Sequence, residues 1–229
     1  SRAPRRIVVV GGGPAGMKAA AVAAERGHQV TLVEASDRLG GQIHLAAALP
    51  GRAEFAGAAD NLAREMEHAG VEVRLRTRAD VDSLRSMDPD AVVLATGAQP
   101  RRPSLEVMGS LPVLDAWQVL SGHEVAPGPV VVADWRSDWI GLGVATALAQ
   151  RGHPTTQAVV GYHPGQRIQQ YVRDSMIAAA IRAGVTVLPL VRPMGVDDDT
   201  VWLQHVLTDD AIALAASSLV LAMGHLPVD

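Results

Sequence analysis

Residues 7–16 read IVVVGGGPAG, a run of branched apolar residues that ends in three glycines. The apolar run Ile7–Val10 predicts a buried β-strand, and the glycines predict a tight turn directly behind it. Pro14 then opens an alanine-rich segment that is closed by Gly27, which is typical of a helix with proline in its first turn and glycine after its last. The stretch therefore predicts a strand–turn–helix unit.

The glycines of this turn follow the spacing G-x-G-x-x-G. Gly11 permits the tight turn, Gly13 allows the backbone to approach a pyrophosphate, and Gly16 allows the helix to pack closely on the strand. Pro14 and Ala15 complete the start of the helix, whose free N–H groups and partial positive charge favour phosphates. The turn is therefore a candidate phosphate-binding loop.

A carboxylate closes the next predicted strand, Gln29–Glu34. At this position Glu34 can accept hydrogen bonds from an adenosine ribose. Strand, loop, helix, strand and acid thus occur in the order that a dinucleotide or another ADP-containing ligand requires. A second glycine pair, Gly40 and Gly41, follows and predicts another close approach of the backbone to that ligand.

The remaining chain continues the alternation of strands and helices. Further strands are expected at 71–76, 91–95, 130–133, 155–160, 185–188, 201–205 and 218–222, with helices at 53–69, 141–150 and 172–183. Five prolines between residues 100 and 129 separate the two sets. This order predicts an α/β fold with parallel, doubly wound sheets. The segments 25–31 (ERGHQVT) and 150–156 (QRGHPTT) resemble each other, so we expect a duplicated module.

Several residues carry a resemblance to a known family. Glu34, Arg38, the glycine pair and the strand end Ala95-Thr96-Gly97 resemble the FAD-binding signature of two-dinucleotide-domain flavoproteins. More narrowly, residues 40–43 (GGQI) and 47–51 (AALPG) resemble the C-terminal region of the trimethylamine dehydrogenase and 2,4-dienoyl-CoA reductase family (the NADH:flavin oxidoreductases). The expected cofactor-binding residues are Gly11, Gly13, Pro14, Ala15, Gly16, Glu34, Ala35, Arg38, Gly40, Gly41, Gln42, Thr96 and Gly97.

The resemblance implies two Rossmann-like dinucleotide-binding modules, the second inserted into the first. Residues 1–108 with 215–229 would form the FAD- or ADP-binding domain, and residues 109–214 a degenerate NAD(P)-type domain. We expect residues 218–225 to contain the strand through which the chain returns from the second module.

The second module has lost the residues of its phosphate loop. Aligning Val10 with Val132 replaces Gly11 by Ala133 and Gly13 by Trp135, and it makes this loop three residues longer. Asp134 and Asp138 would repel a pyrophosphate, and two charges near 4 Å interact by roughly 4 kcal/mol at an effective dielectric of 20. We therefore do not expect NAD(P)H in the second module, as in the amine dehydrogenase branch of the family. Trp135 and Trp139 are expected to pack, with a docking surface or an electron-transfer route as the alternative.

The sequence leaves two ligands for the first module, FAD and ADP. The family resemblance implies FAD, but only the adenosine–pyrophosphate half of its site is complete in the sequence, and the resembled branch includes members with ADP in the same place. FAD is the leading expectation and ADP alone is the alternative.

Composition restricts the function further. The 229 residues contain no cysteine, which excludes a disulfide, a thiolate metal site or a cysteine-bound cluster within them. The net charge of −4 gives no electrostatic reason to expect nucleic acid or an anionic membrane as partner. No apolar run approaches a membrane span, and the basic lead-in at residues 1–6 is expected to be solvated or a linker rather than a signal peptide. A cytoplasmic location is expected.

The resemblance implies one part of a larger flavin-dependent oxidoreductase. Its FMN and 4Fe-4S centres would belong to a partner domain or subunit that oxidises an amine or a related substrate, and an electron-transfer flavoprotein is left open as a further partner. No side chain here is expected to be catalytic, and no histidine spacing indicates a metal site. The alternatives are a structural ADP-binding interaction module without a redox step, and an independent NAD(P)H-dependent flavin reductase.

Overall fold

The structure, a computed structural model, describes residues 3–228; residues 1, 2 and 229, which the expected first domain and the lead-in include, lie outside the described part. The chain folds as two compact units. The first is formed by the residues up to Gln99 together with those from Pro227 onwards, and the second by Pro100–Leu226.

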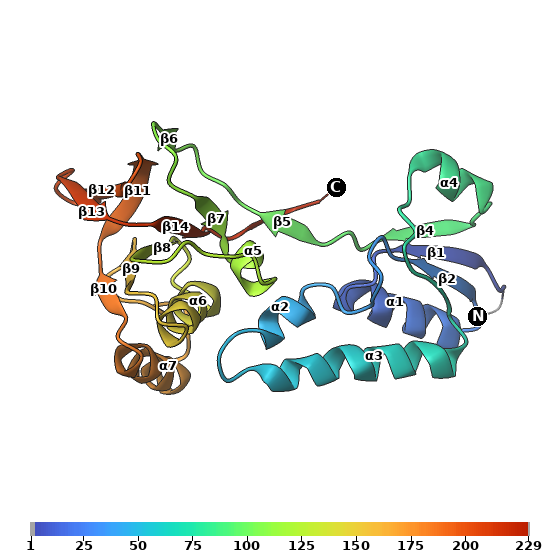
Figure 1. Cartoon of the computed structure of the whole chain (residues 1–229). Coiled ribbons are helices and arrows are strands. Elements are labelled where there is room, and N and C mark those ends of the chain that lie inside the picture. The colour runs from blue at the N-terminus through green and yellow to red at the C-terminus, as the bar shows by residue number, and fades with distance from the viewer. Residues whose placement is uncertain (1–2, 229) are drawn as a thin grey trace. The chain divides into compact units, whose positions relative to one another are not determined.

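The first unit is built on a four-stranded parallel sheet of order β3-β2-β1-β4 (Figure 1). Its central strand β1 runs in register with both neighbours, so that Val9 pairs with Leu32 of β2 and with Val93 of β4. The strands are β1 (Arg6–Val10), β2 (Gln29–Val33), β3 (Glu72–Arg74) and β4 (Ala91–Leu94).

Two helices cover one face of this sheet, α1 (Pro14–Glu25) and α3 (Ala56–Ala69). Met17 of α1 and Met66 of α3 are almost fully buried against Leu32 of the sheet, which gives this unit its own core. Shorter helices lie in the connections: α2 (Ile43–Ala47), η1 (Ala53–Phe55) and α4 (Val81–Ser86).

The second unit repeats this strand order and adds a fifth strand, β10-β9-β8-β14-β7, with all pairs parallel. The strands are β7 (Val113–Asp115), β8 (Val130–Asp134), β9 (Thr155–Val159), β10 (Thr186–Leu188) and β14 (Ser218–Ala222). Its helices are α5 (Ala116–Leu120), α6 (Trp139–Gln150) and α7 (Gln170–Arg182). The fold class expected from the sequence, an α/β protein with two modules of dinucleotide-binding type, is confirmed.

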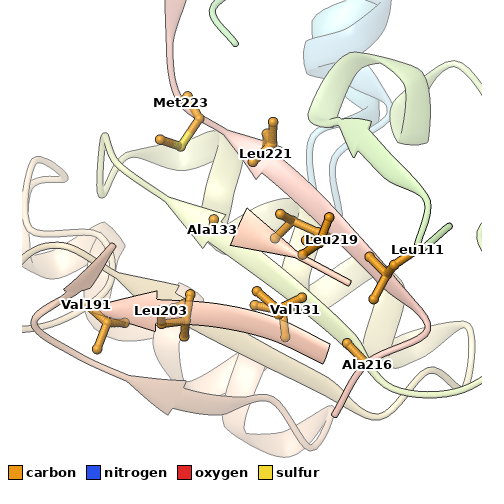
Figure 2. Packing of buried hydrophobic residues seen from close by; sticks show 12 residues of the cluster. Leu111, Val131, Ala133, Val191, Leu203, Ala216, Leu219, Leu221 and Met223 are labelled. Atoms are coloured by element: carbon orange, nitrogen blue, oxygen red, sulfur yellow. The ribbon is translucent and has the colours of Figure 1, made fainter. Parts of the chain in front are cut away.

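A second sheet of order β13-β12-β11-β6 completes this unit. Figure 2 shows its strands packed on β8 and β14, where Val191 and Leu203 meet Val131 and Leu219 in a fully apolar core. These strands are β6 (Glu106–Val107), β11 (Val191–Val196), β12 (Thr200–His205) and β13 (Ala211–Ala215).

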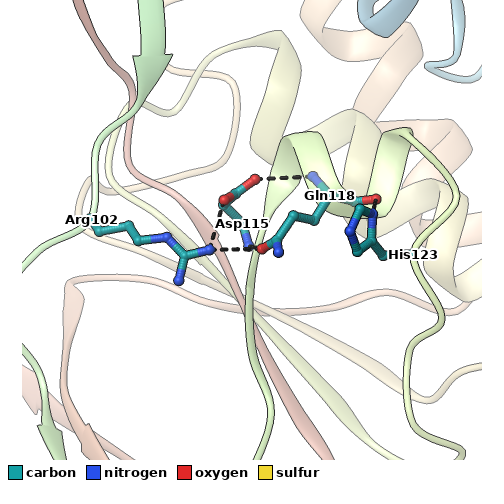
Figure 3. A network of polar contacts seen from close by, with 4 residues as sticks. All are labelled: Arg102, Asp115, Gln118 and His123. Atoms are coloured by element: carbon teal, nitrogen blue, oxygen red, sulfur yellow. Dashed lines mark hydrogen bonds and ion pairs between the residues drawn. The ribbon is translucent and has the colours of Figure 1, made fainter.

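A polar network ties the segment that enters the second unit to α5 (Figure 3). Asp115 caps α5 by accepting from the backbone N–H of Gln118 at 3.0 Å. The guanidinium of Arg102 donates to the Asp115 carboxylate at 2.8 Å and to the side-chain oxygen of Gln118 at 2.7 Å. Asp115 is buried, whereas the Arg102 side chain is half exposed, so this ion pair lies at the edge of the unit.

The units divide at other residues than those we expected from the sequence. The strand Ser218–Ala222 (β14) lies in the second sheet, where it pairs with β7 and β8, because it is the counterpart of β4 in the first unit. The short strands β5 (Ala98–Pro100) and β15 (His225–Pro227) pair with each other where the chain leaves and rejoins the first unit.

Contacts at the start of each loop also correct the alignment of the two modules. A Cβ on the helix-packing glycine would meet the carbonyl of Gly11 in the first unit and the carboxylate of Asp134 in the second. Both residues also direct their backbone hydrogen bond toward the equivalent neighbouring strand, β2 or β9. Asp134 is therefore the counterpart of Gly11, and the expected pairing of Val10 with Val132 is wrong by one residue. Counted from these residues to the helix-packing glycines Gly16 and Gly141, the second loop is two residues longer and not three.

Candidate cofactor-binding site

Two glycines of the first loop are required by the backbone itself. Gly11 has a φ of +108°, and a Cβ added to it would lie 2.3 Å from the carbonyl oxygen of Ala95. A Cβ on Gly16 would lie 1.9 Å from the carbonyl oxygen of Gly11. Any side chain at either position would therefore displace the loop from β4 or from α1.

Gly13 differs from both, because no protein atom lies within 4 Å of where its Cβ would be. It is the N-cap of α1, and no side chain caps this helix. The first intrahelical bond shown runs from the N–H of Met17 to the carbonyl of Gly13, while Pro14 and Ala15 in the first turn are exposed. The helix thus begins next to open space with N–H groups that have no intrahelical acceptor.

Glu34 lies beside this loop, directly after β2. One carboxylate oxygen accepts from the backbone N–H of Gly12 at 2.6 Å, and the other accepts from that of Ser36 at 2.7 Å. Partial burial raises the pKa of Glu34, but the hydrogen bonds from Ser36 and Gly12 outweigh it and hold the pKa below its ordinary value. Each oxygen keeps a second acceptor position, so the ionised carboxylate can still bind ribose hydroxyls.

The second glycine pair packs on the first loop. The N–H of Gly40 donates to the carbonyl of Gly12 at 2.8 Å, and a Cβ on Gly41 would lie 3.1 Å from Cα of Gly13. His44 fixes this turn through a 2.7 Å hydrogen bond between its Nε2 and the carbonyl of Leu39. The sequence indicated a ligand contact for the pair; its contact with the loop became visible only in three dimensions.

The other expected site residues lie in two neighbouring segments. Ala35 and Arg38 are exposed in the turn after β2, and Gln42 approaches the turn at the end of β4, where its amide lies 3.4 Å from the position of a Cβ on Gly97. In that turn the hydroxyl of Thr96 donates to the carbonyl of Val228, and the N–H of Val228 donates to the carbonyl of Gly97. All thirteen expected residues lie in the first unit.

The equivalent position in the second unit is closed by the protein's own carboxylates. Asp138 takes the N-cap position that Gly13 has in the first unit, and its side chain accepts from the N–H of Ile140 at 3.0 Å. The end of α6 thus already has a negative charge as its partner.

Asp134, the last residue of β8, is 2% exposed. Its carboxylate accepts from the backbone N–H groups of Ser137 at 2.8 Å and Arg136 at 3.1 Å, and from the amide of Gln157 at 3.0 Å. Burial is the main cause that raises its pKa from 3.8 to about 7. A Cβ on Gly141 would lie 2.2 Å from the Asp134 Cγ, so this glycine makes room for a carboxylate.

The described part of the chain offers neither a metal-binding cluster nor a membrane-spanning helix. Residues 3–228 contain no cluster of three histidine, aspartate or glutamate side chains placed to hold a metal ion. Within the same residues, no helix combines the length and the apolar character needed to cross a bilayer.

Replacing Glu34 by glutamine is expected to weaken nucleotide binding by about 10-fold or more, because a charged acceptor of the ribose is lost. The amide also cannot accept from both Gly12 and Ser36, so the free energy of unfolding should fall. Since the pKa of Glu34 is lowered on folding, this difference should be present at neutral pH and disappear as the pH falls below 4.5. Calorimetric titration with ADP and urea unfolding at several pH values would measure both effects.

The exposed Asp37→Asn removes a charge from the same turn and serves as the control. Equal ADP affinity in wild type, Glu34→Gln and Asp37→Asn would contradict the assignment of Glu34 to the site.

Two parallel sheets of the same strand order, one with an open glycine loop beside an ionised carboxylate, define a two-domain dinucleotide-binding protein of the flavoprotein type. The family model described as "Pyridine nucleotide-disulphide oxidoreductase" matches residues 5–229, and the chain belongs to this family. It is thus part of a flavin- or pyridine-nucleotide-dependent oxidoreductase. The disulfide chemistry in the family's name has no counterpart in these 229 residues, which contain no cysteine.

The relatives of this chain include a dehydrogenase and an NADH oxidase. The chain is 43% identical over 172 residues to N,N-dimethylglycine/sarcosine dehydrogenase of Chromohalobacter salexigens, covering 72% of this chain and 24% of the relative. It is 36% identical over 200 residues to NADH oxidase of Thermoanaerobacter brockii, covering 84% of this chain and 31% of the relative. Histamine dehydrogenase from Rhizobium sp. 4-9 shares the fold, with a TM-score of 0.91 and 20% identity over 97% of this chain and 36% of its own.

These similarities confirm the family resemblance. The chain spans about a third or less of the length of these relatives, so what their names describe is not yet a property of this chain.

Proposed function

We propose that the first unit binds the ADP half of FAD, and that the chain is the dinucleotide-binding module of an amine-oxidising flavin-dependent dehydrogenase. The single observation that carries this proposal is the open space beside Gly13 at the uncapped start of α1. FMN and a 4Fe-4S cluster would belong to a partner domain or subunit in the cytoplasm, with an electron-transfer flavoprotein as a further partner.

The residues present fit a pyrophosphate flanked by a ribose. The loop brings free N–H groups at the start of a twelve-residue helix next to a space that no side chain fills. Glu34 adds two acceptor positions at the edge of the same loop, and it is held ionised. A phosphate needs such donors and a ribose needs such acceptors. The start of α1 therefore suits the pyrophosphate of an ADP group, and Glu34 suits its ribose.

The chain's own contribution is binding and orientation. FAD, when bound, would supply electron transfer through its ring system, and the protein around it would supply position and electrostatics. The helix α1 holds the pyrophosphate, Glu34 fixes the adenosine end, and the Thr96-Gly97 turn adjoins the second glycine pair through Gln42. No side chain of this chain is proposed to exchange a proton with substrate.

The second unit is proposed to be a degenerate NAD(P)-type domain. Asp138 occupies the end of α6 that a pyrophosphate would need, and Asp134 takes up two further N–H groups of the loop. A bound dinucleotide would have to displace both carboxylates from their hydrogen bonds, at a cost of about 1–3 kcal/mol for each group left unsatisfied. This favours the amine dehydrogenase branch over an NADH-using one.

Purified protein is expected to be yellow, with the visible absorption bands of a flavin, and to release FAD on denaturation. Native mass spectrometry of the same preparation should give the mass of the chain plus one FAD, together with any partner chain that carries FMN and iron. Addition of NADH under anaerobic conditions should leave the visible bands unchanged, because the second unit does not bind the dinucleotide.

Three other outcomes would each contradict the proposal, in part or as a whole. A colourless protein that releases ADP would show that ADP, not FAD, occupies this loop. The chain would then be a structural ADP-binding module without a redox step. Bleaching of the flavin by micromolar NADH would overturn the degenerate second domain and favour the independent reductase. A protein that binds neither FAD nor ADP would contradict the proposal as a whole.

A further inference from the structure

A cavity of about 310 Å³ is lined only by residues of the second unit. It is open at the carboxyl ends of β8 and β14, since Trp135 and Met223 are the residues that follow these two strands. Ligands of open α/β sheets bind at this edge. The complete lining is Arg101, Pro103, Ser104, Trp135, Arg192, Pro193, Met194 and Met223.

The apolar wall of this cavity is partly exposed. Trp135 is 41% exposed and Met194 is 43% exposed, in a chain whose residues are only 3% aromatic. Trp117 and Trp202 donate their indole N–H groups to His225 and Asp197. By contrast, the side chain of Trp135 makes no hydrogen bond within residues 3–228. A flat aromatic face with a free donor at its edge is thus presented to the cavity.

Two arginines line the cavity and no acidic residue does. Arg192 donates through Nε and Nη2 to the side-chain oxygen of Gln204, a neutral partner, at 3.0 and 2.6 Å. Neither Arg101 nor Arg192 belongs to an ion pair among the described residues. Uncompensated arginines beside an aromatic wall favour an anion with a planar group, because guanidinium binds oxyanions in a fork and tryptophan stacks on flat rings.

The volume limits the size of this anion. Ligand pockets span about 300–1,000 Å³, so a cavity at the lower end holds one ring system and not a dinucleotide. The N–H groups that would hold a pyrophosphate in this unit are already bonded to Asp134 and Asp138.

From these observations we infer that the second unit carries a binding site for a small aromatic anion, a single ring system bearing a carboxylate or a phosphate. The ring lies against Trp135 and Met194, and the oxyanion lies between Arg101 and Arg192. The site does not depend on the nucleotide of the first unit, so it stands whether that unit holds FAD, ADP or neither.

The test is a titration of the full, ¹⁵N-labelled chain with benzoate, phenyl phosphate and the neutral benzyl alcohol. The indole N–H signal of Trp135, assigned through Trp135→Phe, is expected to shift in a saturable way with at least one of the two anions and not with benzyl alcohol. Whichever anion binds more tightly identifies the head group. Arg101→Gln and Arg192→Gln should each raise its Kd about 10-fold or more, since each removes one charged donor.

Arg182→Gln removes an exposed arginine of α7 and serves as the matched control, for which the Kd should not change. Unfolding midpoints equal to wild type would show that the variants fold. Three results would each overturn the inference: no shift of Trp135 at anion concentrations of about 10 mM, equal binding of benzyl alcohol, or an anion affinity that both arginine variants leave unchanged.

Discussion

Gly13→Val is expected to weaken FAD or ADP binding by at least about 100-fold, a free-energy loss of roughly 3 kcal/mol, while the protein stays folded. The valine side chain would enter the open space at the start of α1, where the pyrophosphate is proposed to lie. The backbone of Gly13 has a φ of −75° and a ψ of 176°, which valine adopts readily. The free energy of unfolding should therefore change by no more than about 1 kcal/mol.

The neighbouring glycines cannot provide this test. A Cβ on Gly11 or Gly16 would meet backbone atoms at 2.3 and 1.9 Å, so a loss of ligand there would follow from a disrupted loop. Gly57 is the suitable control, because it is in the same unit, has an ordinary φ, and has no atom within 4 Å of its Cβ position. Calorimetric titration should show unchanged nucleotide affinity for Gly57→Val. Retention of the ligand by Gly13→Val would place the pyrophosphate elsewhere.

Asp134→Asn is expected to stabilise the protein at pH 8 by up to about 4 kcal/mol, by less than half as much at pH 5, and to have little effect only below about pH 4. Burial raises the pKa of Asp134 from 3.8 to about 7, and each pKa unit corresponds to about 1.4 kcal/mol. For an acid whose pKa is higher in the folded state, the folded protein binds the proton more tightly. The free energy of unfolding therefore falls as the pH rises from about 4 to about 7, and it is level above that.

Asparagine removes the charge and keeps an oxygen that can accept from Ser137 and Arg136. The Gln157 amide nitrogen donates to Asp134 in wild type, so a flip of that amide would let the asparagine donate to the Gln157 side-chain oxygen, which has no hydrogen-bond partner among the described residues. Urea unfolding of both proteins between pH 5 and pH 8 would measure the difference. Asp174→Asn, an exposed substitution on α7, should give a curve parallel to wild type. Parallel curves for Asp134→Asn would mean that this carboxylate does not titrate as the burial requires.

Much of the first module could be read from the sequence because its signals are local. The branched run before three glycines gave β1, and the alanine-rich segment between Pro14 and Gly27 gave α1, each to within a residue. Glycine is required at Gly11 and Gly16 because the strand–turn–helix unit packs closely on itself and on the end of β4. Glu34 could be placed beside the loop because a parallel β1–β2 pair brings the ends of both strands to the same edge.

The sheet of β6, β11, β12 and β13 was mostly missed. β11 contains Pro193 and Gly195, both poor strand formers, and its register shifts between them. Its strand conformation is determined by packing of Val191 and Val196 on the second parallel sheet. The helix α5 left a signal that could have been used, since Asp115 and Gln118 have the spacing of a capping box.

By itself the sequence determined that this is an α/β protein with two related modules, of which only the first keeps a glycine loop. Periodicity, glycine spacing and the acid after β2 are local properties, and they are sufficient for that conclusion. Only the tertiary structure decided which residue of the second loop corresponds to which of the first, because this match depends on packing and on pairing between distant segments. It also decided what Asp134 and Asp138 do: they are more than charges that repel a phosphate, since they already hold the hydrogen bonds that a phosphate would need.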